Sequence, residues 1–546
     1  MNVALLQSLC GAVDSARLMG HVGEFGRWIK LSGSEGEADS LRYVRARLDE
    51  YGFATQLLHH DAYISLPGRS LVQVDNSALR CITHSFSRAA PDGVRGRLVH
   101  VGAGSDADFS KGDVRGCIVL VDGIATPPVS LRASRAGAIG QLHISPHEHL
   151  HEMCISPVWG NPSAETIGEL PSTVVCSVLL SDGAVLRERL ARGEQASVML
   201  QAEVDTGWRK TPILVADLGT EDDAPFVLFS GHHDTWHYGV MDNGSANASM
   251  LEVARLCAGQ RERWQRGLRM CFWSGHSHGR YSGSTWYVDE HWDELDRRCV
   301  AHINVDSVGA EGADILGNVG SMSALGALAA EAIETQSGQR LLGKRMSRGA
   351  DQSFNGVGLP ALFGDLSEPV PTPVGAHCWW WHTPDDLGDK ISEPNMVRDT
   401  RIYVHAVWRL LSDRVLPLDF GAYAGELLGE LERLRTALGE RLSVDALVDA
   451  ATALRVRAAA LSGDAERVNQ ALMRMSRALV PMDYTSGDRF AHDPALALPA
   501  WPTLQPLRAL AGAAVGSDEA RFLAVGAVRA RNRVAHALRE AVWAAG

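Results

Sequence analysis

Residues 225–260 read PFVLFSGHHDTWHYGVMDNGSANASMLEVARLCAGQ. The apolar run at the start predicts a buried strand. A polar segment follows that contains His232, Asp234 and Asp242, and the small and apolar residues after it predict a helix. A buried strand that leads through a polar turn into a helix is typical of a parallel sheet covered by helices.

The same pattern recurs between residues 206 and 415. Further apolar runs are PILVADL at 212–218, LRMCFWSG at 268–275, VAHINVDS at 300–307 and PALFGD at 360–365. Strands that alternate with helical stretches predict an α/β domain with parallel strands and helices on both faces of the sheet. We assign residues 1–65 and 206–415 to this domain. Ligands bind such sheets at the carboxyl ends of the strands.

Two other parts of the chain show different patterns. Residues 66–205 contain short β-rich runs and no recurring charged cluster, so we expect an inserted β-rich domain that covers the α/β domain. Residues 416–546 place apolar residues at helical spacing, interrupted by the proline-rich stretch LPAWPTLQP, and predict a helical domain. These helices would serve folding alone or form an oligomer interface.

Charge and cysteine content narrow the class of protein. The formal net charge of −13 argues against broad electrostatic binding to nucleic acid or to acidic membranes. No apolar run approaches the roughly 20 residues that span a bilayer, and residues 1–28 lack the basic start and apolar core of a signal peptide. The nine cysteines are scattered and form no CxxC pair, so we expect no disulfide framework and a cytoplasmic protein.

Four polar segments, each after a predicted strand, hold residue types that bind metals. They contain His232 with Asp242, two histidines in FWSGHSHGRYSGS, Asp306, and His382. Imidazole and carboxylate groups suit a divalent cation, and one aspartate can bridge two ions. We therefore expect one or two ions, with His232 on one, His382 on the other and Asp242 between them, while Asp306 completes one side. Zinc is favoured, and manganese, cobalt, iron, nickel and copper remain open.

Each of these segments alone has a simpler interpretation. Asp242 with the Asn-Gly-Ser that follows is typical of a turn that caps a helix, and Asp306 would also serve as a cap. His382 would then be a histidine buried beside the tryptophans at 379–381. The metal site is the better interpretation, because four strand ends each present a ligand type.

Together these segments resemble the metallopeptidase family that includes zinc aminopeptidases, glutamate carboxypeptidase II and the transferrin receptor. GHHDTWHYGVMDNGSA is similar to the family's His-x-Asp and bridging aspartate, and INVDSVG and WWHTPDD are similar to its later ligand motifs. RGADQSFNGVGLPAL, residues 348–362, resembles the segment that shapes the substrate pocket. The resemblance covers nearly the whole length and implies a zinc-exopeptidase-like fold, with a mixed, mostly parallel sheet sandwiched by helices.

The resemblance extends to the two other parts. Residues 66–205 resemble the protease-associated domain that is inserted ahead of the catalytic core. Residues 473–504, in the helical domain, resemble the dimerisation domain of the carboxypeptidase branch, which implies a homodimer. We expect no membrane anchor.

One strand end departs from the family pattern. At this position the family has a Glu-Glu pair, of which the first is the general base and the second binds a metal. Aligned from the strand, the pair falls on His276 and Ser277; aligned from the Gly-Ser that follows, it falls on Ser277 and His278. Because imidazole serves as a ligand or as a base near neutral pH, we predict His278 as a metal ligand and His276 as the base or a second ligand. In the alternative, both histidines only line the pocket.

These residues together predict a metal-dependent hydrolase that cleaves an amide bond of a small peptide, an N-acyl amino acid or a related amide. Asp234, two residues after His232, is predicted to orient that histidine during the reaction. Trp236, Trp286 and the tryptophans at 379–381 indicate an aromatic-lined pocket. Two alternatives stay open: a non-catalytic binding protein that resembles the transferrin receptor, and a metal enzyme of altered chemistry, such as a lyase or ring-opening enzyme.

Overall fold

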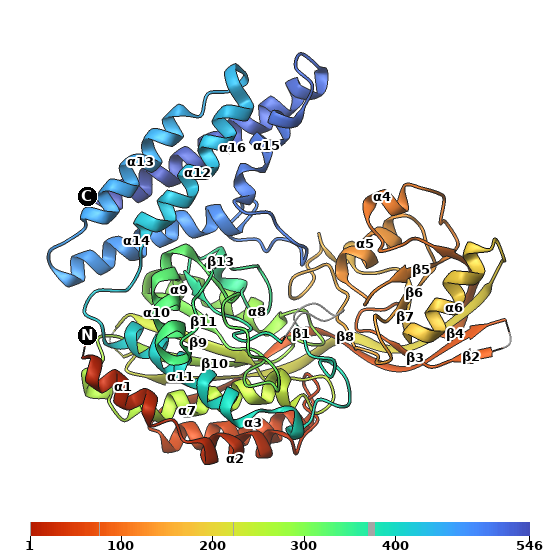
Figure 1. Ribbon diagram of the computed structural model, residues 1–546, viewed down its shortest axis with the longest axis horizontal. Coiled ribbons are helices and arrows are strands. Elements are labelled where there is room, and N and C mark those ends of the chain that lie inside the picture. Colours follow the sequence, from red (N-terminus) through yellow and green to blue (C-terminus); the bar gives the residue numbers. More distant parts are fainter. Residues whose placement is uncertain (1, 76, 222, 370–376) are drawn as a thin grey trace.

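The computed structural model describes residues 2–75, 77–221, 223–369 and 377–546 and contains three parts (Figure 1). An α/β part lies at the lower left of the view, and a β-rich inserted part extends to the right. The C-terminal helices rise above the α/β part. The three parts follow the order of sequence patterns described above.

The sheet of the α/β part is built around three parallel strands, β9 (Phe226–His232), β10 (Gly267–Trp273) and β11 (Cys299–Asn304). β14 (Ala361–Leu362) pairs parallel with β11, whereas β8 (Ser197–Leu218) pairs antiparallel with β10. The prediction of a mixed, mostly parallel sheet is therefore confirmed. Because β9, β10 and β11 run in one direction, their carboxyl ends meet at the same edge of the sheet.

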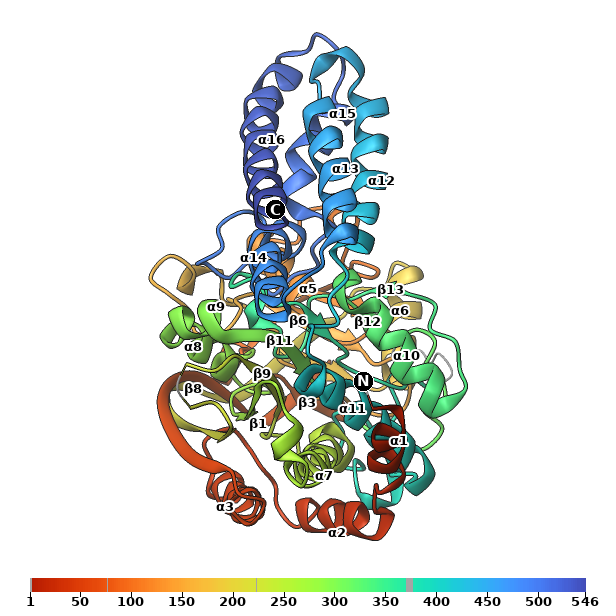
Figure 2. The same cartoon turned by 90° about the vertical axis from the view of Figure 1, so that its left-hand side faces the viewer.

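Helices cover both faces of this sheet (Figure 2). The covering helices are α1 (Val3–Gly11), α2 (Ser15–Phe25), α3 (Glu35–Glu50), α7 (Ala246–Ala258), α8 (Ser282–Glu290), α9 (Trp292–Arg298), α10 (Gly326–Ser337) and α11 (Glu393–Ser412). Alternate side chains of β9 face opposite sides: Phe226 and Leu228 join the cluster with α8 and α9, and Val227 and Phe229 join the cluster with α7 and α11. This two-sided burial explains why the strands read as continuous apolar runs.

Two long antiparallel strands connect the α/β part to the inserted part. β1 (Ala54–Val74) pairs with β8 along nearly its whole length, from Ala54 opposite Asp217 to Val74 opposite Val198. The boundaries predicted at 65/66 and 205/206 therefore fall inside two continuous strands. The other elements of the inserted part are β2 (Ser77–Leu79), β3 (Cys81–Thr83), β4 (Ala90–His100), β5 (Ile118–Asp122), β6 (Gly140–Ile144), β7 (Val174–Val178), α4 (Asp106–Phe109), α5 (Pro127–Arg135) and α6 (Leu180–Ala191).

The C-terminal part is helical. Its helices are α12 (Phe420–Leu438), α13 (Asp445–Ala460), α14 (Ala465–Tyr484), α15 (Gln505–Gly512) and α16 (Asp518–Ala544). α14 rests on the α/β part, where Ser476 Oγ donates to the carbonyl of Gly358 at 2.6 Å and Arg477 donates to the carbonyl of Cys299. Within the described ranges, none of the helices combines the length and the apolarity that crossing a bilayer requires.

Candidate metal centre

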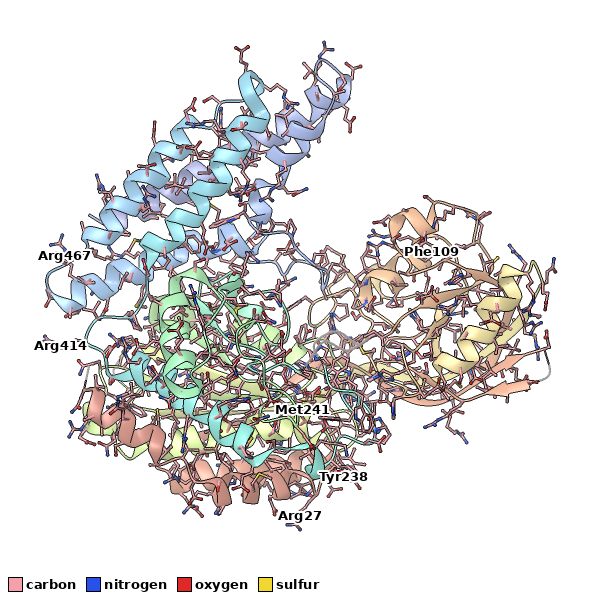
Figure 3. All side chains as sticks on the ribbon, in the orientation of Figure 1. Arg27, Phe109, Tyr238, Met241, Arg414 and Arg467 are labelled. Carbon is pink, nitrogen blue, oxygen red and sulfur yellow. The ribbon has the colours of Figure 1, made fainter. Side chains whose placement is uncertain are left out.

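His232 is the last residue of β9, and two carboxylates face its ring from separate loops. Its Nε2 lies 2.9 Å from Asp242 Oδ1 and 3.4 Å from Asp306 Oδ1. The loop after β9 supplies Asp242, and the chain just beyond β11 supplies Asp306. The side chain of Met241, beside Asp242, lies inside the α/β part (Figure 3). The parallel arrangement of β9 and β11 thus brings these three residues together.

The hydrogen bond of its other ring nitrogen fixes the tautomer of His232. Its Nδ1 lies 2.8 Å from the carbonyl oxygen of Asp234 and must donate to it, so Nε2 carries a lone pair. That lone pair faces the lone pairs of Asp242 Oδ1, and both atoms are buried without a hydrogen-bond partner. Two buried acceptors this close need a proton or a cation between them. The donor set therefore fits a divalent cation.

The two carboxylates also raise the proton affinity of His232. Burial alone would lower its pKa, but the carboxylates of Asp306 and Asp242 outweigh burial and hold the pKa well above its ordinary value. Positive charge is thus strongly favoured at this position.

Asp242 contacts a second histidine through its other oxygen. His382 Nε2 lies 3.0 Å from Asp242 Oδ2, and His382 Nδ1 lies 2.7 Å from the carbonyl oxygen of Glu152 in the inserted part. His382 therefore also turns a lone pair towards the carboxylate. Asp386 holds this carboxylate in place, because it accepts hydrogen bonds from the backbone N–H groups of Met241 and Asp242 at 2.8 and 3.0 Å. Asp242 occupies the position of a bridging ligand between two imidazoles.

His276 joins the centre, and an aspartate that sequence analysis did not single out holds it there. One donor atom each of His232, His276 and Asp306 lie within 4.8 Å of one another. The rings of His276 and His232 stack with centroids 3.7 Å apart. His276 Nδ1 lies 2.9 Å from Oδ2 of the buried Asp351, whose Oδ1 accepts from Ser284 Oγ at 2.8 Å. Asp351 belongs to the RGADQSFNGVGLPAL segment, so the resemblance to a pocket-forming segment was the signal that pointed to it.

His278 lies behind the centre. It is completely buried, with Nδ1 2.9 Å from Ser32 Oγ and its ring 4.3 Å from that of Trp236. It is not among the described residues that line the cavity over the centre, whereas His276 and Ser277 are. Its assignment as a metal ligand stays a prediction, and the geometry favours His276.

Asp234 contacts His232 through its backbone. Its carbonyl, and not its carboxylate, accepts from His232. The carboxylate accepts from Ser32 Oγ at 2.6 Å and from the backbone N–H groups of Ser277 at 2.9 Å and His276 at 3.2 Å. Burial would raise the pKa of this carboxyl, but its histidine neighbours hold the pKa well below the usual range. The side chain therefore positions the turn that carries His276.

A cavity of about 290 Å³ opens over these residues. Trp236 and Trp381 line it, as do Arg280 and Tyr281. The other predicted pocket tryptophans, at 286, 379 and 380, are not among its lining residues. The cavity is lined by aromatic rings and by ligand-type residues, and it is large enough for a small substrate.

The sequence is similar to those of known peptidases. Residues 214–407 match the family model described as Peptidase family M28. The probable glutamate carboxypeptidase AMP1 of Arabidopsis thaliana is 22% identical over 533 residues, covering 80% of this chain and 73% of that protein. The probable glutamate carboxypeptidase LAMP1 of the same plant is 26% identical, but the match covers 48% of this chain and less than half, 43%, of LAMP1.

Solved structures show the same fold. An aminopeptidase from Aneurinibacillus sp. strain AM-1 aligns with a TM-score of 0.57 at 20% identity, covering 74% of this chain and 96% of that one. A peptidase M28 precursor from Shewanella amazonensis aligns with a TM-score of 0.61 at 16% identity, covering 76% and 97%. With the ligand-type residues gathered at the sheet edge, the match of residues 214–407 to the Peptidase family M28 model supports a metal-dependent peptide hydrolase.

Proposed function

We propose that the protein hydrolyses an amide bond of a small peptide or an N-acyl amino acid, with zinc as its metal. One observation carries this proposal: each oxygen of the buried carboxylate of Asp242 faces an imidazole nitrogen whose lone pair points at it, so that a cation is needed between them. Imidazole and carboxylate ligands suit zinc. One structural neighbour is a zinc aminopeptidase from Bacillus subtilis, which supports the same metal here.

Two groups of residues would hold the metal. His232, Asp242 and Asp306 would hold one ion, with His276 within reach of it; Asp242 and His382 would hold a second. The chemistry that a divalent cation supplies in such a site is polarisation of a carbonyl oxygen and acidification of a water molecule. The carbonyl of Glu152 fixes the tautomer of His382, so the inserted part contributes directly to the site.

His276 would take the place of the family's glutamate. Asp351 accepts the Nδ1 proton of His276, which leaves a lone pair on Nε2. That lone pair is what a general base needs in order to accept a proton and what a ligand needs in order to bind a cation. As a base, His276 would take a proton from water and pass it to the leaving amine, while Asp351 would keep the ring oriented and stabilise its positive charge.

The proposal is tested with purified protein that is stripped of metal and reloaded with zinc. We expect hydrolysis of short peptides or N-acyl amino acids that disappears with the metal and returns on zinc addition. Absence of hydrolysis by the zinc-loaded protein across a broad panel would refute the enzymatic function. Because both family glutamates are missing, that result would favour a binding protein with the same fold.

We also propose a homodimer in the cytoplasm. α16 exposes Phe522, Val525 and Trp543, whose side chains are 78%, 54% and 74% accessible, and such a surface suits a second copy of the chain. All nine cysteines are free, which suits a reducing compartment. Light scattering of the wild type and of a Phe522→Glu variant tests the dimer, and a monomeric wild type would contradict it. Cell fractionation tests the compartment, and recovery from a secreted fraction would contradict it.

A further inference from the structure

A second cavity lies where the three parts of the chain meet, and we call it the junction cavity. Leu131, Val158 and Trp159 of the inserted part line it, together with Trp286 of α8 and Leu496 of the C-terminal part. Its volume is about 640 Å³, within the range of cavities that hold small molecules. Sequence analysis placed Trp286 in the substrate pocket, but the residue lines the junction cavity instead.

The titratable residues of the junction cavity are already paired with one another. Arg135 donates to Glu169 at 2.7 Å, and a ring nitrogen of His492 lies 2.9 Å from the carboxylate of Asp289. The hydroxyl of Thr285 donates to a backbone carbonyl at 2.7 Å. Among the described lining residues, no charge is therefore left over for an ionic ligand, and burying an unpaired charge between apolar walls is costly. These contacts favour an uncharged ligand with an apolar body.

Two aromatic rings separate the junction cavity from the cavity over the metal centre. Tyr281 lines the cavity over the metal centre and Trp159 lines the junction cavity, and the two sets of described lining residues do not overlap. The rings of Trp159 and Tyr281 pack with centroids 4.4 Å apart. A ligand in the junction cavity would thus rest on a ring that supports the wall of the other cavity.

A chain of buried hydrogen bonds connects Trp159 to the metal centre. Trp159 Nε1 donates to Ser353 Oγ at 2.9 Å, and Ser353 Oγ lies 2.9 Å from Ser284 Oγ. Ser284 Oγ donates to one oxygen of Asp351 at 2.8 Å, and the other oxygen lies 2.9 Å from His276 Nδ1. Since the indole only donates and the carboxylate only accepts, both hydroxyls point their hydrogens towards Asp351. The contacts of Trp159 therefore help to hold Asp351 and, through it, the ring of His276.

We propose that the junction cavity binds an uncharged, mainly apolar small molecule and that this molecule speeds the reaction at the metal centre. Burial of apolar surface supplies the affinity. A molecule that fills the cavity holds Trp159 in contact with Ser353 and so keeps the hydrogen-bond chain to Asp351 intact. The binding site does not depend on the proposed hydrolysis, whereas the effect on the rate rests on it.

Two dyes with the same aromatic body test the binding site. N-phenyl-1-naphthylamine is uncharged, and 8-anilinonaphthalene-1-sulfonate carries one negative charge; both fluoresce more strongly in apolar surroundings. The wild type is expected to bind one neutral dye per chain at the junction cavity, at least about tenfold more tightly than the sulfonate, because the cavity offers that charge no partner.

Leu496→Trp fills the junction cavity and is expected to abolish this binding. Leu498→Trp is the matched control, because Leu498 is also half-buried, follows two residues later and is not among the described lining residues. Its affinity for the neutral dye should stay near that of the wild type. Melting curves show whether each variant folds, and Leu131→Trp, from the inserted part, is a second variant that fills the cavity.

The zinc-loaded protein tests the link to the metal centre. Saturating neutral dye is expected to raise kcat/KM for an N-acetyl amino acid by about 2- to 10-fold, the range that corresponds to one hydrogen bond. Ser353→Ala interrupts the chain between Trp159 and Asp351. This variant should bind the dye as the wild type does and should lose most of the rise in rate.

The outcomes separate the cavity from the hydrolysis. Equal affinity for the two dyes would overturn the binding site, as would full binding of the neutral dye by folded Leu496→Trp. A rate that does not rise at saturating dye would overturn the link to the metal centre. If the zinc-loaded protein cleaves no substrate, the proposed hydrolysis fails, and the dye titrations still decide whether the junction cavity binds an apolar molecule.

Discussion

Replacing Asp351 with alanine removes the acceptor that holds the Nδ1 proton of His276. The contact is 2.9 Å long and the aspartate is fully buried, so water does not replace it readily. Without this acceptor the ring can rotate, and either nitrogen can carry the proton. The fraction of the protein with a lone pair on Nε2, directed at the centre, should therefore fall.

The size of the effect follows from the lost contact. A hydrogen bond to a charged group contributes about 1.5–3 kcal/mol, and about 1.4 kcal/mol corresponds to tenfold in rate. We therefore expect kcat/KM of Asp351→Ala to fall by about 10- to 150-fold. Zinc bound at His232 and Asp242 should stay near the wild-type amount, because Asp351 does not contact those residues in the described structure.

A double-mutant cycle is the sharpest assay. Hydrolysis rates are compared for Asp351→Ala, His276→Ala and the double variant, with zinc content measured by mass spectrometry and folding by thermal unfolding. Since Asp351 acts through His276, the double variant should be no slower than His276→Ala alone. Ser284→Ala, which removes the other hydrogen bond to Asp351 at 2.8 Å, is the control and should have a smaller effect. The reasoning is refuted if Asp351→Ala slows the His276→Ala variant by the same factor as the wild type.

Three further outcomes are expected. Asp242→Ala should lose metal and activity together, because one carboxylate serves both imidazoles; retention of two ions would disprove the bridge. His382→Ala should lower the zinc content to one ion per chain or less, and an unchanged content of two would contradict its role. Burial lowers the pKa of His84 to about 3 and of His143 to about 4, below the ordinary value near 6.5. The stability that these two neutral imidazoles contribute is therefore complete above about pH 6.5 and is lost as the pH falls towards 4. The melting temperature should drop between pH 7 and pH 4.5, and it should drop less in His143→Gln. An identical drop in that variant would count against this cause.

The fold was largely predictable because its central strands are buried on both faces. β9, β10 and β11 are continuous apolar runs, and each is followed by polar residues at its carboxyl end. Parallel pairing then brings His232 and Asp306 together without further information. The domain boundaries were harder to place. β1 and β8 each run on from one part into the next and stay paired, so no loop or turn marks the change.

The roles of the two histidines in GHSHG depend on tertiary contacts. The carboxylate of Asp234 binds the backbone N–H groups of His276 and Ser277 and thereby sets the direction of the turn. This contact leaves His276 at the centre and directs His278 towards Ser32. Asp351 lies 75 residues after His276, and only the folded arrangement pairs them. Sequence spacing carries no record of such a contact.

Crystals of the zinc-loaded protein, with anomalous diffraction recorded at the zinc edge, test the central claim most directly. The account predicts a zinc peak at roughly 2.0–2.2 Å from His232 Nε2 and Asp242 Oδ1, with Asp306 in contact with the same ion. A well-resolved structure in which His232 is protonated and donates directly to Asp242, with no anomalous peak between them, would contradict it.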